Sequence, residues 1–163
     1  MLTFLNLEAE GFCSIESLHL QLNPTCTILI KAPNGKGKST ILSALVWAIY
    51  GKNLKGVSEV NTWKQVRPKD YKGTKVQVYF QKDSHTYKIV RCQKYDEVLE
   101  DGAKGKDRLI FMKDGDIVDI KGKGKIQDFI NREIGLSYTL FMNSIMFGQG
   151  IKRLIQESNS DKK

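Results

Sequence analysis

The chain has 163 residues, enough for one domain, and 40% of them are hydrophobic, enough for a buried core. No apolar run reaches the roughly 18 residues of a membrane-spanning helix, and the N-terminus lacks the basic and apolar regions of a secretory signal, so we expect a cytoplasmic protein with no membrane partner. The formal net charge of +8 favours a polyanion such as nucleic acid, a nucleotide or anionic lipid, but charge alone does not distinguish among them.

The first thirty residues have the pattern of strands. Residues 4–7 open an apolar strand, and residues 18–22 alternate leucines with polar side chains, which is the period of a half-buried strand. Asn23-Pro24 marks a turn. The apolar run at 27–30 is short and nearly continuous, so we expect a strand that is buried on both faces.

The middle of the chain passes from a helical to a strand period. Apolar residues from Ile41 to Ile49 cover almost every side of a helix, which predicts a helix inside the protein that ends at Gly51. Residues 52–74 are basic, polar and irregular, and they predict a long surface segment. Alternation over 76–91, interrupted by polar turn residues, predicts a β-hairpin.

The last third predicts a second hairpin and two helices. Residues 102–106 are expected to form a basic loop that leads into the hairpin at 109–118. Residues 121–125 are expected to be a loop as well. Apolar residues recur at helical spacing over 126–134 before a glycine, which predicts a helix, and a second short helix is expected at 139–144.

Residues 32–40 match the phosphate-binding P-loop pattern G-x-x-x-x-G-K-[ST], which belongs between a buried strand and a helix. The expected strand at 27–30 and the helix from Ile41 supply that context. The first glycine of the pattern is replaced by Ala32, whereas the later glycines and the Lys-Ser pair are intact. The residues expected to surround the phosphates are Ala32, Pro33, Asn34, Gly35, Lys36, Gly37, Lys38, Ser39 and Thr40.

The residue types of this loop suit a nucleoside triphosphate with Mg²⁺. Gly35 and Gly37 permit a tight turn whose N–H groups point at phosphate oxygens, and the following helix adds free N–H groups and the positive end of its dipole. Lys38 supplies a positive charge for the β- and γ-phosphates, and the Ser39 hydroxyl is a hard oxygen ligand for Mg²⁺. We therefore expect ATP and Mg²⁺ as cofactors.

Several longer segments resemble one family. The strings NGKGKST and LSALVWAIYGK at 34–52, and IGLSYTLFMNSIMFGQG at 134–150, resemble the N-terminal lobe of the structural-maintenance-of-chromosomes (SMC)-like ATPases. The resemblance is to the branch that repairs DNA double-strand breaks, which includes bacteriophage recombination-endonuclease ATPase subunits. The hairpin at 75–91 resembles that branch's V-x-V-x-F … Y-x-I-x-R pattern, so the resemblance spans residues 2–157. It implies an α/β fold, the ABC-ATPase-like N-terminal lobe of a P-loop NTPase, β-rich with hairpins and a central buried P-loop helix.

The resemblance also implies roles for individual residues. Gln149 matches the Q-loop glutamine, whose amide contacts Mg²⁺ and the attacking water and links ATP binding to lobe movement; a neutral amide oxygen is suited to Mg²⁺. Lys38 and Gln149 are then the expected catalytic residues, and Ser39 and Gln149 the expected metal ligands. Asn34 matches a position near the γ-phosphate. The turn Phe12-Cys13-Ser14 matches one near the nucleotide where relatives often carry Arg or Ser, and Cys13 departs from the Arg form.

By the same resemblance, the chain is half of a composite site. We expect residues 1–157 to form the N-terminal lobe of an ATPase head, with the Q-loop at about 147–150, and residues 158–163 to begin a truncated coiled-coil helix or a frayed tail. No apolar run that ends in Asp-Glu, the Walker B pattern, follows the Q-loop segment, and no Ser-Gly-Gly signature is present, so these would come from a C-terminal lobe and from a second head. The implied partners are that lobe, the second head, a DNA-repair nuclease subunit and DNA. The three cysteines lack metal spacing and predict thiols in a reducing compartment.

Three functions remain open from the sequence. The first is an ATP-driven DNA-repair ATPase, of which this chain alone binds ATP without efficient hydrolysis. The second is a GTPase or small-molecule kinase, although the nearest string to a guanine-reading Asn-Lys-x-Asp segment, at 66–70, lacks the Asn. The third is a non-catalytic basic module for nucleic acid, which the charge and the aromatic residues Trp63 and Tyr71 favour. ATP binding that depends on Lys38 would separate the first from the third.

Overall fold

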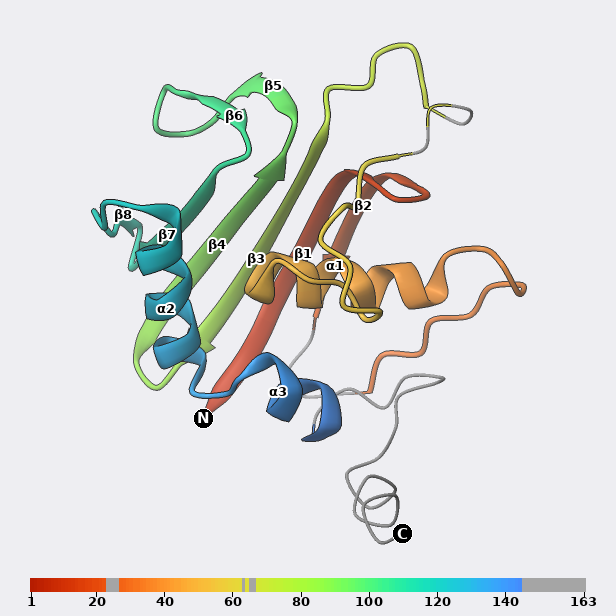
Figure 1. The fold of residues 1–163 in the computed structure, drawn as a ribbon. Coiled ribbons are helices and arrows are strands. Elements are labelled where there is room, and N and C mark those ends of the chain that lie inside the picture. Colours follow the sequence, from red (N-terminus) through yellow and green to blue (C-terminus); the bar gives the residue numbers. More distant parts are fainter. Residues whose placement is uncertain (23–26, 63, 65–66, 145–163) are drawn as a thin grey trace, which may run out of the picture.

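The chain folds around a six-stranded antiparallel sheet with its helices on one face (Figure 1). The structure is a computed structural model that describes residues 1–22, 27–62, 64 and 67–144. The strands are β1 (Leu2–Phe12), β2 (Ile15–Gln21), β3 (Thr74–Lys82), β4 (His85–Gln93), β5 (Tyr95–Val98), β6 (Lys104–Lys106), β7 (Leu109–Lys113) and β8 (Asp116–Ile117). The helices are α1 (Lys38–Tyr50), α2 (Lys123–Ile134) and α3 (Tyr138–Ser144).

The order of strands in the main sheet is β2-β1-β3-β4-β7-β8, and β5 and β6 pair separately as a two-stranded ribbon. Hairpins join β1 to β2, β3 to β4 and β7 to β8. The predicted hairpins at 76–91 and 109–118 are confirmed, since a tight antiparallel connection depends mainly on local alternation and turn residues.

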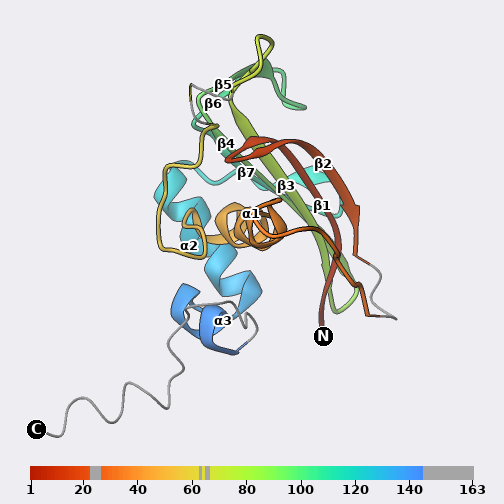
Figure 2. The same cartoon turned by 90° about the vertical axis from the view of Figure 1, so that its right-hand side faces the viewer.

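The core lies between one face of the sheet and the helices α1 and α2 (Figure 2). On β3, Val76, Val78 and Phe80 are fully buried and alternate with polar residues that point to the other face. On α1, the residues from Ala44 to Tyr50 are all buried, whereas the first turns are partly exposed. The predicted apolar helix is therefore confirmed, and its C-terminal half contributes most to the core.

The predicted strand at 27–30 is wrong for this structure. Within the described residues, 27–30 pair with no strand, and Leu29 is 72% exposed while Ile28 and Ile30 are more than a third exposed. An apolar run becomes a buried strand only where neighbouring strands bond its backbone on both sides. The described strands leave the run unpaired, so its apolar side chains face solvent.

Three other segments differ from the prediction. The loop expected at 102–106 contains a strand, β6, because its backbone pairs with β5 across the ribbon. Helix α2 begins at Lys123, inside the loop expected at 121–125. In the segment 52–74, the described residues before β3 form neither an α-helix nor one of the named strands, as predicted. Val60 and Thr62 are buried, so this part of the segment covers the core and does not run wholly over the surface.

The predicted short helix at 139–144 is confirmed as α3, which packs against the end of α1. Tyr50 and Phe4 both make edge-on ring contacts with Phe141. The hydroxyl of Tyr50 donates to the carbonyl oxygen of Leu136 at 3.0 Å. The hydroxyl of Tyr138 donates to the carbonyl oxygen of Asn53 at 2.8 Å. These contacts fix the chain that leads to residue 145.

Neither thiol that the structure describes is paired: Cys13 is half-buried and Cys92 is buried. Burial raises the pKa of Cys92 to about 12, so the thiol stays protonated and unreactive at neutral pH. In the described part of the chain, no helix is both long and apolar enough to cross a bilayer.

Candidate nucleotide-binding site

The predicted P-loop forms a turn that leads directly into α1. Gly35 has φ of +79° and Gly37, at the N-cap of α1, has φ of +83°, a left-handed conformation that side chains disfavour. A Cβ on Gly35 would meet no atom within 4 Å, so the conformation of its backbone, and not lack of space, favours glycine there. The positions predicted from the pattern are therefore the ones where the loop turns.

The N-terminus of α1 is open to an anion. No side chain caps it, and its first turn carries no acidic residue. The first N–H groups of a helix have no acceptor within the helix, and the macrodipole places positive potential at this end. Such an end favours a phosphate group without needing any further cation.

Lys38, the first residue of α1, folds back over the loop. Its ammonium donates to the carbonyl oxygens of Ala32 at 2.6 Å and Pro33 at 2.9 Å. Ser39 and Asn34 are exposed on the same loop. The structure thus places a cation, a hydroxyl, an amide and the helix N-terminus around one small region.

The turn between β1 and β2 lies beside the loop. A Cβ built on Gly37 would come 3.5 Å from the hydroxyl oxygen of Ser14. Cys13 has φ of +52° and its N–H donates to the carbonyl of Val60 at 2.7 Å, which ties the turn to the irregular segment after α1. Burial raises the pKa of the Cys13 thiol, so this residue is neutral and does not supply charge to the site.

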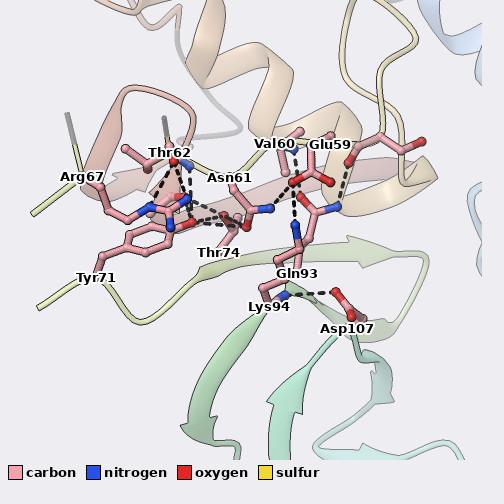
Figure 3. Close-up of polar contacts among 12 residues, drawn as sticks. Glu59, Val60, Asn61, Thr62, Arg67, Tyr71, Thr74, Gln93, Lys94 and Asp107 are labelled. Atoms are coloured by element: carbon pink, nitrogen blue, oxygen red, sulfur yellow. Dashed lines mark hydrogen bonds and ion pairs between the residues drawn. The ribbon is translucent and has the colours of Figure 1, made fainter. Parts of the chain in front are cut away.

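A polar network fastens that irregular segment to the sheet (Figure 3). The hydroxyl of Thr74 donates to the carbonyl of Gly11 at 2.6 Å, and Tyr71 lies 3.2 Å from Asn61 through its hydroxyl. The guanidinium of Arg67 donates twice to the carbonyl of Thr62 and stacks over the ring of Tyr71, 4.4 Å from its centroid. The turn at Cys13 and Ser14 is held in place by this network.

Gln93, at the end of β4, continues the attachment. Its amide oxygen accepts from the N–H of Val60 at 2.9 Å, and its amide nitrogen donates to the carbonyl of Ser58 at 3.1 Å. Of these network residues, the sequence analysis named only Tyr71, as an aromatic residue that would favour nucleic acid. The others are common polar types that only the fold brings together.

The predicted site residues 32–40 and the turn 12–14 therefore lie together. The helix after the loop is the one that the sequence predicted, whereas the strand expected before it, at 27–30, is not formed. Gln149 and the rest of the expected Q-loop lie outside the described residues. Ser14 is the residue of the turn whose side chain reaches the loop, and its position beside Gly37 was not apparent from spacing.

Comparison with known proteins gives one family and several relatives. The model of a family described as an AAA domain matches residues 6–163. A probable DNA double-strand break repair Rad50 ATPase of Aquifex aeolicus is 28% identical over 161 residues, which cover 98% of this chain and 16% of the relative. A DNA double-strand break repair Rad50 ATPase of Methanopyrus kandleri is 23% identical over 163 residues, which cover 96% of this chain and 17% of the relative. The chain therefore spans about a sixth of the length of these curated relatives.

Solved structures share the fold. The recombination mediator protein RecF with ATP matches with a TM-score of 0.51 and 19% identity, over 77% of this chain and 30% of that one. A chain from work on ATP-driven dimerization and DNA stimulated activation of SMC ATPases matches with a TM-score of 0.53 and 19% identity, over 96% and 90%. The fold class and the family resemblance expected from the sequence are confirmed.

Proposed function

This chain belongs to the AAA domain family, and from that membership we propose that it is the ATP-binding N-terminal lobe of an ATPase head that acts in DNA repair. The observation that carries the proposal is the loop at 32–37, whose two left-handed glycines lead into the uncapped N-terminus of a buried helix. A turn with a purely structural role would not require a lysine and a serine at the first two positions of that helix, Lys38 and Ser39. The relatives that match almost the whole chain bear the names of DNA repair ATPases.

The residues of the loop fit ATP with Mg²⁺. Among the described residues, the ammonium of Lys38 donates to the neutral carbonyl oxygens of Ala32 and Pro33, and phosphate oxygens would be stronger acceptors for it. The exposed hydroxyl of Ser39 would serve as a ligand of the metal, and Asn34 would lie near the γ-phosphate. When bound, Mg²⁺-ATP supplies the phosphoryl group and the charge that these side chains orient. Gln149 would add a second metal ligand and a contact to the attacking water.

We further propose that residues 1–157 are one lobe of a composite site, and that residues 158–163 begin a truncated coiled-coil helix or form a frayed tail. The apolar residues at 28–30 support this, because exposed side chains of this kind favour burial against another surface. A C-terminal lobe would pair with this run and supply the general base. A second head would supply the signature loop across the nucleotide, so two heads would close on two ATP molecules.

DNA and a nuclease subunit are the proposed macromolecular partners, in the cytoplasm. Basic residues concentrate at 52–72, 102–108 and 121–125 in a chain of net charge +8. Contacts from such basic segments go mostly to phosphates, so the affinity for DNA should fall steeply with salt and depend little on the base sequence. Closure of the heads on ATP would be the signal that reaches the nuclease.

Calorimetry with ATP and GTP tests the nucleotide assignment. Wild-type protein should bind Mg²⁺-ATP in preference to GTP, and Lys38→Ala should abolish binding because it removes the only side-chain cation that the described loop directs at its own turn. The variant also loses two hydrogen bonds of the loop, so a stability loss of about 1–2 kcal/mol is expected. Normal ATP affinity in Lys38→Ala would refute the site.

A turnover assay tests the half-site. The chain alone should bind ATP and hydrolyse it negligibly, because positioning of water, metal and far-side charge would be incomplete. Mixing it with the matching C-terminal lobe should restore hydrolysis, and Gln149→Ala should then reduce turnover more than binding. Robust hydrolysis by the isolated chain would contradict the proposal.

A further inference from the structure

A buried arginine sits at the opposite end of the P-loop helix from the candidate site. Arg91, on β4, is only 5% exposed. It shares the inward face of its strand with Tyr87 and Ile89, where an apolar side chain is the ordinary occupant. A charge in that place is costly to bury unless its hydrogen bonds are satisfied, so its partners indicate what it does.

Those partners are the last carbonyls of α1. The Nε of Arg91 donates to the carbonyl oxygen of Ala48 at 2.9 Å, and one Nη donates to that of Ile49 at 3.1 Å. Gly51 ends the helix, and a Cβ there would come 3.0 Å from the other Nη, so the glycine leaves room for the guanidinium. The last carbonyls of a helix lack partners within it and form the negative end of its dipole.

No carboxylate forms an ion pair with Arg91 among the residues that the structure describes. Burial lowers the pKa of Arg91 to about 10, which still leaves the guanidinium charged at neutral pH. The compensation for this buried charge comes from the last carbonyls of α1, from the side-chain amide of Gln127 and from the ring of Trp47, whose centroid lies 5.8 Å from the guanidinium. Helix α1 has 13 residues, so its two ends lie roughly 20 Å apart. A phosphate bound at the N-terminus and Arg91 at the C-terminus would complement the two ends of the same helix dipole.

Gln127 links this junction to α2. Its amide oxygen accepts from Arg91, and its amide nitrogen donates to the carbonyl of Ile49 at 2.9 Å and to the side chain of Asn131 at 3.0 Å. Ile49 thus accepts from a strand and from a second helix at one oxygen. Because α2 leads through Leu136 into α3, whose contacts with Tyr50 were described above, the end of α1 is joined to both later helices.

We propose that Arg91 and Gln127 are positioning residues that couple nucleotide binding at the start of α1 to the order of α2 and α3. The proposal rests on the proposed function, since it requires ATP to bind at the P-loop. A ligand that fixes the N-terminus of α1 restrains the whole helix, because a packed helix moves as a rigid rod. The junction passes that restraint to α2 and α3 as reduced motion without a large shift in structure.

Hydrogen exchange of the chain with and without Mg²⁺-ATP tests this coupling. In the wild type, ATP should slow amide exchange both at residues 34–41, where it binds, and at 126–144, which the described structure places away from the loop. Gln127→Met keeps the shape of the side chain but cannot bridge Arg91 to Ile49. It should bind ATP within about threefold of wild type, keep the protection at 34–41 and lose at least half of the protection at 138–144.

Two further variants serve as controls. Asp128→Asn changes the exposed neighbour on the same helix and should leave both regions as in the wild type. Arg91→Lys keeps the charge, but a single ammonium cannot reach two carbonyls and an amide as a planar fork does, so it should lose the remote protection as Gln127→Met does. If Arg91→Lys fails to fold, Gln127→Met, whose side chain is only half-buried, still decides the question.

The outcomes separate this inference from the proposed function. Wild-type protection at 138–144 in Gln127→Met would overturn the coupling while leaving ATP binding intact, and so would a wild type that binds ATP without protecting 138–144. Failure of the wild type to bind ATP at all would refute both.

Discussion

Replacing Gly35 by alanine isolates the backbone conformation of the P-loop from every other property of the site. The residue has φ of +79°, and its Cβ would stand in open space, so the substitution adds no steric contact. Its cost is that of holding an L-residue in the left-handed region, about 1–2 kcal/mol. Because the loop is exposed, the free protein can relax out of this conformation, and the cost then appears when ATP requires it again.

A cost of that size corresponds to a loss of ATP affinity of roughly 5- to 30-fold. Isothermal titration calorimetry with Mg²⁺-ATP measures it directly. Gly115→Ala is a matched control, because Gly115 also has a positive φ, +93°, and open space for a Cβ, but it lies in the β7–β8 turn, at the other side of the molecule (Figure 1). The control should lower the melting temperature by about 2–8 °C without changing ATP affinity. ATP affinity within twofold of wild type in Gly35→Ala would refute the conformational role.

Three other perturbations have defined outcomes. Gly73→Ala should cost more than about 3 kcal/mol in urea unfolding, because a Cβ there would lie 2.0 Å from the carbonyl oxygen of Lys94; a milder loss would mean that the two backbones separate easily. Hydrogen bonds from Thr86 and then His85 lower the pKa of Asp114, so its contribution to stability exists above the unfolded pKa and is lost as the pH falls through the folded one. When the pH is lowered below about 4, the free energy of unfolding should therefore fall less in Asp114→Asn than in the wild type. Equal falls in the two proteins would contradict this role of Asp114. Glutamine in place of four lysines of β6 and α2 should reduce the slope of log affinity for DNA against log salt by up to about 3.6, and an unchanged slope would exclude these two elements from the contact. The four are Lys104, Lys106, Lys123 and Lys125.

The segment at 27–30 shows where sequence reasoning was insufficient. The same apolar run would occur in a strand with two neighbouring strands, with one or with none. The run shows that its side chains favour burial, but it does not show which strands are present to pair with its backbone. The hairpin β3–β4 had no such ambiguity, because both of its strands and the turn between them lie within 20 residues.

Two further differences have the same origin. The strand β6 is a Lys-Gly-Lys tripeptide with low strand propensity, and only its pairing with β5 makes it a strand. Arg91 lies on the inner face of β4 with Tyr87 and Ile89. The alternation of the strand does not show that the last carbonyls of α1 lie beside its guanidinium.

The sequence by itself predicted the P-loop turn, the buried helix after it and the hairpins, because each depends on residues that are close neighbours in the chain. The α/β fold class followed from the family resemblance of longer segments. Only the tertiary structure decided that Ser14 reaches Gly37, that the segment 52–74 is fastened across β1 and β3, and that Arg91 and Gln127 close the far end of α1. These contacts join residues tens of positions apart, and a hydrogen bond between such residues follows from the packing of sheet and helix, which no local pattern encodes.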